Sequence, residues 1–376
     1  MCVKIILAAW SCASVLWWMI TWRLVATVVK PSNAAIPLPT KKSLTIFKPL
    51  PLLDGRGLEV EARGLESFIS QLDEKSELLL GVHESDGPDV LPFVERMQAA
   101  YPRAKIIVVR RSEPDTLANP KIAWEKILVS RASGELWLWS DADIIAPPDF
   151  LAQAQSEFEA SQVEMLTFPF AIRTLPRPPA IWDALFVNTE FYPGALLLRR
   201  LGPVDFGLGA AMLFSRDSFL RKVDWEKLGS ALADDFMLGQ MLQPVQLGSI
   251  TLETVADVTS WQGALSHYYR WKKTVYWCRP LGFAAQILVM PLLGWIVFVA
   301  LHPLSLLAWG GFLGMIQVDV LFAALICQKI RCPLTGHSWL ALEAWSMFRV
   351  LFWIACWFPG QVKWREKCWH SFRQST

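Results

Sequence analysis

Charged residues are scarce in this chain, because Asp, Glu, Lys and Arg together make up only 19% of its 376 residues. An ordinary soluble domain carries about 25%. Apolar residues make up 53% of the chain, and Trp alone occurs 20 times. The net charge is only +2, whereas proteins that bind nucleic acid by its phosphates carry a strong basic excess. The composition therefore argues against an ordinary soluble protein and against nucleic acid as a partner.

Cysteine is missing from the middle of the chain, and no two cysteines form a C-x-x-C pair. The thiols lie in or beside apolar segments: Cys2, Cys12, Cys278, Cys327, Cys332, Cys356 and Cys368. This pattern offers neither a disulfide framework nor a zinc site. It is typical of a protein exposed to the reducing cytoplasm. Internal repeats and low-complexity tracts are missing as well.

Long apolar runs are present at both ends of the chain. The first, residues 5–29, is longer than a bilayer crossing requires. It is also too long and too rich in Trp for the core of a signal peptide, so we predict a retained transmembrane anchor over residues 1–30. Four basic residues gather on its carboxyl side: Arg23, Lys30, Lys41 and Lys42. By the positive-inside rule, the domain that follows faces the cytoplasm.

The second apolar region covers residues 280–360. Three candidate membrane helices follow one another there: Leu281–Leu301, Leu304–Ile326 and Leu340–Phe358. The third carries Glu343 and Arg349, and charges are costly at the centre of a bilayer. Three full crossings would also place the basic tail, residues 361–376, on the outside. We therefore predict two spanning helices, one re-entrant or interfacial helix and a cytoplasmic tail, in an integral protein of the inner (cytoplasmic) membrane.

Residues 43–271 are richer in charge and are predicted to form a cytoplasmic catalytic domain. Short apolar runs suited to strands alternate there with segments of helical periodicity. The expected strands are 44–47, 78–82, 105–109, 136–139 and 165–170, and the expected helices are 59–72, 90–100 and 118–131. This alternation favours an α/β fold with a mostly parallel, Rossmann-like sheet and helices on both faces.

Two carboxylates follow the predicted strand at 136–139. Asp141 and Asp143 come directly after it, and a Pro-Pro pair soon stops regular structure. Open α/β sheets bind ligands at the carboxyl ends of their strands, and side chains two residues apart on an extended chain point to one side. Such a pair of oxygen ligands suits Mg²⁺ or Mn²⁺, which can bridge substrate phosphates. The alternative is a surface turn with two solvated carboxylates.

Other polar residues are expected near the same edge of the sheet. Asp86 follows the predicted strand 78–82, so it is a candidate for nucleoside binding, as is Glu84. Lys121 follows Pro120 at the start of a helix, where backbone amides favour anions, so it is a candidate for substrate phosphates. Turn chemistry at Asp86 and a solvated helix position at Lys121 are the alternatives.

Two adjacent acids, Asp234 and Asp235, open a later apolar helix. Asp235 is a candidate general base, because a carboxylate held near a hydroxyl can remove its proton during attack. The alternative is helix capping by Asp234, with Asp235 in the first turn. Upstream, Gly207 and Gly209 would let the backbone approach a ligand closely.

The predicted catalytic domain ends in S-H-Y-Y-R-W, residues 266–271. Arg270 offers a planar fork of donors for diphosphate oxygens, and Trp271 offers a face on which a ring can stack. His267 could ligate a metal or hydrogen-bond a phosphate. Aromatic and basic residues also gather at membrane interfaces without any catalytic role, so a juxtamembrane anchor is the alternative.

Five short motifs, taken in order, resemble those of a known family. They are K-P-L at 48–50, N-P-K-I at 119–122, D-x-D at 141–143, D-D-F at 234–236 and H-x-x-R-W at 267–271. The set resembles the membrane-bound ceramide glucosyltransferases and bacterial relatives such as the hopanoid-associated glycosyltransferases, which belong to the family-2-like enzymes with the GT-A fold. The resemblance covers residues 43–271 and the flanking apolar segments.

The resemblance implies a GT-A fold and an inverting glycosyltransferase. The enzyme would move a sugar of the glucose or N-acetylglucosamine class from a UDP-sugar to a membrane lipid hydroxyl, such as that of ceramide or a hopanoid. Asp143 would be a metal ligand, Asp235 the base, and Arg270 with Trp271 would act at the donor diphosphate and the acceptor. Asp141 and His267 are further candidate ligands of a divalent cation, Mg²⁺ or Mn²⁺. The remaining motif residues would bind substrate: Lys48, Asp86, Lys121, Asp141, Asp234 and His267.

Three positions depart from the family pattern. The first acidic motif of the family often places Asp directly before Pro, but Gly87 precedes Pro88 here, so Asp86 or Glu84 must serve. The D-A-D sequence is closer to the bacterial pattern than to the D-S-G of animal enzymes. His267 stands where the animal and processive enzymes have Gln.

Two other interpretations stay open at this point. A polyprenyl-phosphate sugar transferase or a processive polysaccharide synthase would share the fold, but a synthase should have more spanning helices and Q-x-x-R-W. A catalytically silent membrane scaffold would be expected to lose the metal and base carboxylates. Asp143 and Asp235 are both present.

Overall fold

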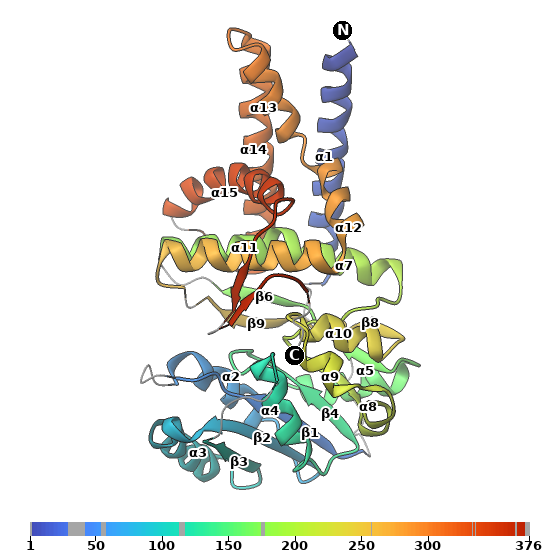
Figure 1. Cartoon of the computed structure of the whole chain (residues 1–376), viewed down its shortest axis with the longest axis vertical. Helices are drawn as coiled ribbons and strands as arrows, with labels where there is room; N and C mark the ends of the chain where they lie inside the picture. The colour runs from blue at the N-terminus through green and yellow to red at the C-terminus, as the bar shows by residue number, and fades with distance from the viewer. Residues whose placement is uncertain are drawn as a thin grey trace. The chain divides into compact units, whose positions relative to one another are not determined.

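The computed structural model describes residues 2–28, 42–53, 58–112, 117–173, 177–256, 258–332, 334, 336–364 and 367–372. These form two compact units, which we call the sheet unit and the apolar unit (Figure 1). The sheet unit comprises Ser32–Ala171, Leu198–Val255 and Arg373–Thr376, and the apolar unit comprises Met1–Pro31, Ile172–Leu197 and Ala256–Phe372. Residues 172–197 and 256–271, which fall within the predicted catalytic domain, therefore cluster with the apolar helices.

The sheet unit is built on a seven-stranded sheet in the order β3-β2-β1-β4-β7-β5-β8. Its strands are β1 (Leu44–Pro49), β2 (Ser76–His83), β3 (Lys105–Arg111), β4 (Leu136–Trp139), β5 (Met165–Thr167), β7 (Met212–Ser215) and β8 (Val245–Leu247). Only β7 runs antiparallel to its neighbours, β4 and β5, while the other neighbouring pairs are parallel. The predicted α/β fold with a mostly parallel sheet is confirmed.

Helices cover both faces of the sheet (Figure 1), and every residue of β1 and β4 is buried as a result. The helices of this unit are α2 (Glu59–Ile69), the short turn η1 (Glu84–Asp86), α3 (Gly87–Ala100), α4 (Pro120–Val129), α5 (Phe150–Ala160), α8 (Arg216–Lys222), α9 (Trp225–Gly229) and α10 (Asp234–Met241). Trp137 and Trp139 of β4 pack on Phe219 with ring centroids 5.3 and 5.1 Å apart. The apolar run in the sequence is therefore the centre of the core.

One predicted strand, 165–170, is divided in two by Pro169. β5 ends at Thr167, and β6 (Phe170–Arg173) pairs instead with β9 (Leu252–Val255) in a separate two-stranded sheet. Proline has no backbone N–H to donate, so it cannot continue the ladder of a central strand. Its carbonyl still accepts a hydrogen bond from the N–H of Leu252 at 2.9 Å. The predicted strand is correct in place but wrong in length.

The apolar unit is mostly helical. Its elements are α1 (Cys2–Val28), α6 (Pro178–Phe186), η2 (Val187–Phe191), α11 (Trp261–Cys278), α12 (Pro280–Ala285), η3 (Gln286–Val289), α13 (Leu292–Leu301), α14 (Leu306–Lys329), α15 (Gly336–Ala355) and the strands β10 (Val362–Trp364) and β11 (Lys367–Trp369). One more helix, α7 (Tyr192–Leu201), follows η2 directly. The element η2 is a π-helix, a form of helix that is frequent at functional sites.

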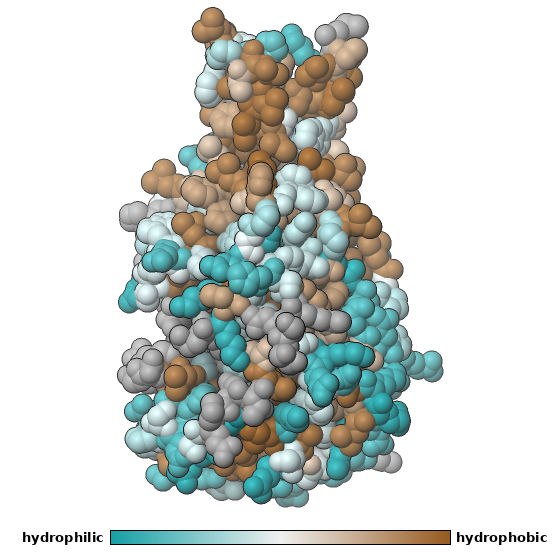
Figure 2. Space-filling view, viewed as in Figure 1, coloured by the Kyte–Doolittle hydropathy of each residue, from teal (hydrophilic) through white to brown (hydrophobic). Residues whose placement is uncertain are grey.

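Two helices in the described part of the chain are long and apolar enough to cross a membrane: Cys2–Thr27 and Leu306–Lys329. The predicted span Leu281–Leu301 is not one straight helix, because its halves, Pro280–Val289 and Leu292–Leu301, are bent by 62°. Such a pair is a broken span or a re-entrant loop, so spanning by this segment stays a prediction. The surface over α13 and α14 is largely apolar (Figure 2). Leu304, between the two helices, and Leu306, the first residue of α14, are 97% and 90% exposed. By length and composition, these helices indicate association with a membrane.

Helix α15 is not among these candidate spans, and its charged residue Arg349 is buried against other helices. A guanidinium nitrogen of Arg349 lies 3.7 Å from Oδ2 of Asp319 on α14. The same carboxylate accepts hydrogen bonds from Trp18 of α1 at 2.8 Å and from Ser346 of α15 at 2.7 Å. A buried polar cluster of Trp18, Asp319, Ser346 and Arg349 therefore joins three helices, and the arginine that looked costly in the sequence has a partner.

Candidate active site

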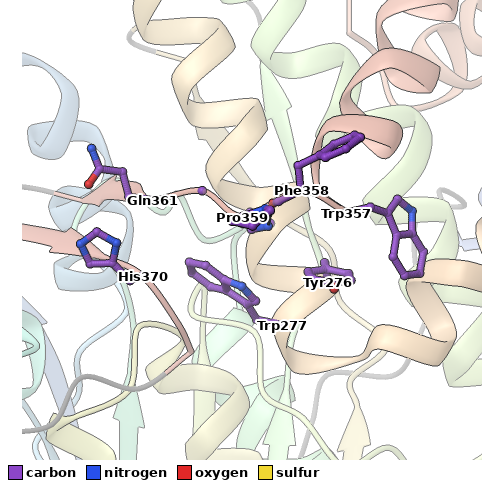
Figure 3. Close-up of a pocket in the computed structure, with 9 residues that line it drawn as sticks. Tyr276, Trp277, Trp357, Phe358, Pro359, Gln361 and His370 are labelled. Atoms are coloured by element: carbon purple, nitrogen blue, oxygen red, sulfur yellow. Dashed lines mark hydrogen bonds between the residues drawn. The ribbon is translucent and has the colours of Figure 1, made fainter.

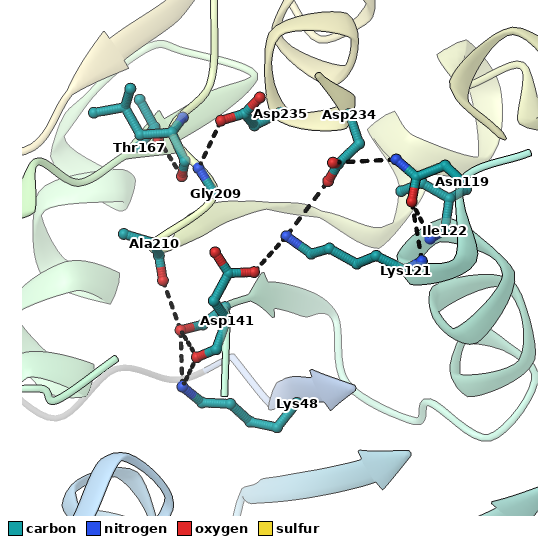
Figure 4. A network of polar contacts seen from close by, with 12 residues as sticks. Lys48, Asn119, Lys121, Ile122, Asp141, Thr167, Gly209, Ala210, Asp234 and Asp235 are labelled. Atoms are coloured by element: carbon teal, nitrogen blue, oxygen red, sulfur yellow. Dashed lines mark hydrogen bonds and ion pairs between the residues drawn. The ribbon is translucent and has the colours of Figure 1, made fainter. Parts of the chain in front are cut away.

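Lys48, at the end of β1, holds the backbone that carries the D-A-D sequence. Its fully buried ammonium donates to Oγ of Ser140 at 2.9 Å and to the carbonyl of Asp141 at 2.7 Å (Figure 4). Burial lowers the pKa of Lys48 to about 7, although the charges of Asp143 and Asp141 oppose that shift. Lys48 therefore fixes the turn at the end of β4, which is where the acidic side chains begin.

Lys121 lies between two of the predicted acids. Its ammonium is 2.6 Å from Oδ1 of Asp141 and 3.4 Å from Oδ2 of Asp234 (Figure 4). Burial by itself lowers the pKa of Lys121, but the two carboxylates raise it above its ordinary value, so the side chain stays protonated. The structure thus uses Lys121 to bridge the end of β4 and the start of α10. Substrate phosphate binding by Lys121 stays a prediction.

Asn119 explains the position of both Lys121 and Asp234. Its side-chain oxygen caps α4 by accepting the N–H of Lys121 at 2.9 Å, while its amide donates to Asp234 at 3.3 Å. Asp234 is buried, and the residue that precedes it, Ala233, is the N-cap of α10. Helix capping by Asp234, the alternative raised by the sequence, is therefore wrong, since this carboxylate faces Asn119 and Lys121 instead.

Asp235 meets Asp141 across a glycine. The N–H of Gly209 donates to Oδ2 of Asp235 at 3.0 Å, and the carbonyl of Gly209 accepts the N–H of Asp141 at 3.3 Å (Figure 4). A Cβ at Gly209 would lie 3.2 Å from the Asp141 carboxylate and 3.6 Å from that of Asp235. Glycine therefore leaves room between the two acids, and close approach of this backbone to a ligand stays a prediction.

The pKa of Asp235 is raised toward neutral pH. Burial, followed by the nearby charge of Asp234, raises the pKa of Asp235 to about 6. Hydrogen bonds from the N–H groups of Phe236, at 2.8 Å, and Gly209, at 3.0 Å, keep the carboxylate oriented. A carboxyl with a pKa in this range can accept a proton at physiological pH and release it again.

Asp143 completes the acidic group of the sheet unit. The hydroxyl of Thr254 on β9 donates to Oδ2 of Asp143 at 2.8 Å. Burial and then the charge of Asp141 raise the pKa of Asp143. In α2, Gly64 allows the helix to approach this turn, because a Cβ there would lie 2.4 Å from the carbonyl oxygen of Ala142.

The two D-A-D carboxylates fit a divalent cation that takes its other ligands from substrate and water. Among the described residues, no group of three or more His, Cys, Asp and Glu side chains could hold a metal. Protein Mg²⁺ sites commonly use only one or two carboxylates together with substrate phosphates. Burial and then the charge of Asp141 raise the pKa of Asp143, and a bound cation would oppose both effects by favouring the ionised carboxylate.

Asp86 is buried and engaged by the backbone. Its Oδ2 accepts the N–H of Leu53 at 2.8 Å, so it ties the segment after β1 to the end of β2. Glu84 lies in the same turn, η1, and its side chain is exposed. Nucleoside binding by either acid stays a prediction.

A buried acid that the sequence analysis missed, Glu125, lies one helical turn after Lys121 on α4. It is fully buried, and neither carboxyl oxygen has a hydrogen-bond partner in the described structure. Burial raises the pKa of Glu125 well above its ordinary value, although the charge of Lys121 opposes the shift. The i, i+4 spacing of Lys121 and Glu125 was the available signal, but that spacing is common on exposed helix faces.

Replacing Glu125 by Gln should change the pH dependence of stability. A carboxyl whose pKa is raised in the folded state contributes stability at low pH that is lost as the pH rises through the folded-state pKa. Glu125→Gln removes this loss, so at pH 8 its free energy of unfolding should exceed that of the wild type by about 1.4 kcal/mol per pKa unit of the shift. Thermal unfolding at pH 5 and pH 8 would measure this. Glu95→Gln, on an exposed face of α3, is the control, and equal pH dependence in all three proteins would contradict a protonated Glu125.

The H-x-x-R-W motif lies in the apolar unit, on α11, and its partners come from α6 and η2. Nδ1 of His267 lies 2.5 Å from Oδ1 of Asp183, and Nε1 of Trp271 donates to Nε2 of His267 at 2.8 Å. Glu190 of η2 accepts hydrogen bonds from Tyr268 and Lys272. Local sequence gave no signal for the two acids, because each lies more than 70 residues from its partners.

Arg270 is half-buried on α11, between His267 and Trp271 along the chain. Its predicted role at the donor diphosphate, and that of Trp271, stay predictions. Both ring nitrogens of His267 are occupied by protein groups in this structure. Metal binding by His267 stays a prediction, and it would require one of these two contacts to break.

A cavity of about 650 Å³ also lies in the apolar unit, at the end of α11 (Figure 3). Its lining residues are Lys273, Tyr276, Trp277, Trp357, Phe358, Pro359, Gly360, Gln361 and His370. Lys273 donates to the carbonyls of Cys356 and Phe358 at 2.7 and 2.8 Å and so fixes the end of α15. None of the residues predicted for catalysis or substrate binding lines this cavity.

Comparison with known families decides the class of the protein, because the profile of "Glycosyl transferase family 21" matches residues 3–374. The chain belongs to glycosyl transferase family 21. This membership confirms the predicted GT-A-type fold class and the predicted enzyme class, a hexosyltransferase. A search of curated proteins found no match to this family 21 chain.

Solved structures similar to the family 21 chain include two complexes with nucleotide sugars. "Mannosyltransferase PcManGT from Pyrobaculum calidifontis in complex with GDP-Man and Mn2+" is 17% identical, with a TM-score of 0.46 over 94% of this chain and 98% of that chain. "S. aureus TarS 1-349 in complex with UDP-GlcNAc" is 12% identical, with a TM-score of 0.40 over 88% of this chain and 97% of that chain.

Proposed function

We propose that this family 21 protein transfers a sugar, of the glucose or N-acetylglucosamine class, from a UDP-sugar to the hydroxyl of a membrane lipid such as ceramide or a hopanoid. One observation carries the proposal. Asp235, with a pKa of about 6, lies across Gly209 from the D-A-D sequence that would bind the donor. Direct transfer to a hydroxyl requires a base with a pKa near neutral pH, close to a pair of carboxylates that would bind a metal.

The reaction is a single displacement. The acceptor hydroxyl gives its proton to Asp235, its oxygen bonds to the anomeric carbon, and the bond from that carbon to the diphosphate oxygen breaks. Because attack comes from the face opposite the leaving group, the product has inverted configuration. Gly209 and Phe236 keep Asp235 oriented through their N–H groups, which limits the reorganisation needed during attack.

A divalent cation would be held by Asp143 and Asp141. When bound, Mg²⁺ or Mn²⁺ supplies positive charge to the departing nucleoside diphosphate. Thr254 orients Asp143 through its hydroxyl, and Lys121 holds Asp141 by one carboxylate oxygen. Lys48 fixes the turn between them. Arg270 would add a second positive charge at the diphosphate.

The proposed acceptor follows from the apolar helices. Two candidate spans would keep the enzyme at a membrane, with the catalytic domain on the cytoplasmic side, where nucleotide sugars are made available to it. A lipid acceptor could then be glycosylated without leaving the bilayer. We assign the N-terminal anchor to residues 1–30 and the catalytic domain to residues 43–271.

The pH dependence of the reaction should report Asp235. Below a pH of about 6 the carboxyl is protonated and cannot accept the hydroxyl proton, so kcat/KM should fall about tenfold per pH unit. An ordinary Asp would place this fall near 3.8. Initial rates between pH 4.5 and 8.5 would measure the profile, and a profile that is flat down to pH 4.5 would contradict Asp235 as the base.

The function itself is tested with membranes that contain the protein and a panel of labelled nucleotide sugars. We expect label from one UDP-sugar in the extracted lipid fraction, with inverted anomeric configuration by NMR. Membranes with the Asp235→Asn protein are the control. Label in a polyprenyl phosphate or in a polymer would instead favour the corresponding alternative enzymes, and retained configuration would contradict the mechanism.

A further inference from the structure

Three side chains in the apolar unit form a continuous polar chain between α6 and α11. Oδ1 of Asp183 lies 2.5 Å from Nδ1 of His267, and Nε2 of the same ring lies 2.8 Å from Nε1 of Trp271. Asp183 is buried, at 4% exposure, so water does not compete for this contact. The ring of His267 is thus held at both nitrogens.

The contact with Trp271 shows where the proton of His267 lies. An indole N–H can only donate a hydrogen bond, so Nε2 of His267 must accept one and cannot carry a proton. The imidazole is therefore neutral, with its proton on Nδ1, from which it donates to Asp183. An imidazolium, or the tautomer protonated at Nε2, would place two N–H groups against each other at 2.8 Å.

The ring of Trp271 is also held by aromatic side chains. Phe186 of α6 and Phe191 of η2 meet it edge-on, with centroids 5.9 and 5.1 Å away and interplanar angles of 71° and 80°. These contacts locate the ring, and the hydrogen bond to His267 fixes its rotation. Loss of the hydrogen bond would remove the polar contact that selects this rotation of the indole.

We propose that Asp183 and His267 are a positioning pair that holds Trp271 in one orientation. Asp183 fixes the tautomer of His267, and His267 presents a lone pair to the indole. The pair acts through Trp271 and does not touch substrate. This rests on the proposed function and on the role that the family resemblance implies for Trp271, at the donor diphosphate and the acceptor. It also accounts for His in the place of Gln in the motif, since the carbonyl of a Gln can accept the same indole N–H.

The tautomer is tested directly, without activity. The full-length protein in lipid nanodiscs, labelled with ¹⁵N-histidine, contains five histidines, and His267→Gln assigns the signal of His267 by its loss. We expect a neutral ring with a protonated Nδ1 and an unprotonated Nε2. In Asp183→Leu this single tautomer should be lost. A ring protonated at Nε2 in the wild type would overturn the proposal.

Activity variants test the effect on catalysis. Asp183→Asn keeps an acceptor for the Nδ1 proton and should stay within about threefold of wild-type kcat/KM, while His267→Gln keeps an acceptor for the indole N–H and should lose less activity than His267→Phe. Asp183→Leu and His267→Phe remove those acceptors and should lose about tenfold or more, since small misplacements of a positioning group are costly. His370→Gln is the matched control, and thermal unfolding checks that each variant is folded.

The outcomes separate the pair from the proposed function. If folded Asp183→Leu and His267→Phe proteins keep wild-type kcat/KM, the positioning pair is wrong and the transferase proposal stands. If no nucleotide sugar labels any lipid, the proposed function fails, while the tautomer measurement still decides the arrangement of the three side chains.

Discussion

Asp235→Asn is expected to lower kcat by about a thousandfold, the range in which general bases contribute. The amide is close in shape to the carboxyl but cannot take the proton of the acceptor hydroxyl. The carbonyl oxygen of the Asn side chain can still accept an N–H from Gly209 or Phe236. The fold of α10 should therefore persist. Binding of the UDP-sugar, measured by calorimetry, should stay within a few-fold of the wild type.

The control for this variant is Asp217→Asn, an exposed acid in the first turn of α8. It should leave both kcat and donor affinity unchanged. If Asp235→Asn instead loses donor binding and transfer to the same extent, Asp235 has a structural or metal-binding role and the base must be sought elsewhere.

Removal of the divalent cation should have the second largest effect. Treatment with EDTA is expected to abolish transfer, and Mn²⁺ or Mg²⁺ should restore it. Asp143→Asn weakens the carboxylate ligand that burial and Asp141 hold at a raised pKa, so half-maximal activity should need about 10- to 100-fold more metal. Metal titration of transfer in the two proteins would measure the difference.

Asp149→Asn is a closely matched control for Asp143→Asn. Asp149 lies a few residues further along the chain and is exposed, with a φ of 61° that Asn also tolerates. The metal titration of this variant should match that of the wild type. Full activity of the EDTA-treated enzyme would remove the metal from the mechanism.

The sequence predicted the elements of the sheet unit well because local pattern determines them. The run Leu136–Trp139 is apolar and rich in Trp, and it forms the buried central strand β4. The predicted helix 118–131 corresponds to α4, which begins at Pro120 after the cap of Asn119. Pro169 was a local signal for the end of β5. The apolar residues on both sides of it nevertheless led to the prediction of one strand over 165–170.

The sequence could not predict which charges pair. Lys121 looked like an anion site because it opens a helix, yet Asp141 and Asp234 reach it from other elements. The same holds for Asp183, which lies 84 residues from His267. Pairing of this kind depends on which strand ends and helices the fold brings together. The spacing of residues along the sequence does not predict it.

The cluster of Trp18, Asp319, Ser346 and Arg349 has a consequence for how the chain is assembled in the cell. A helix with a lone arginine partitions poorly into lipid, and the acid that accepts this one belongs to α14, which is translated earlier. Helix α15 should thus settle only once α1 and α14 are already in place. With Arg349→Leu, α15 could enter the membrane before α1 and α14 are in place. The same change would leave Asp319 buried without its counter-charge.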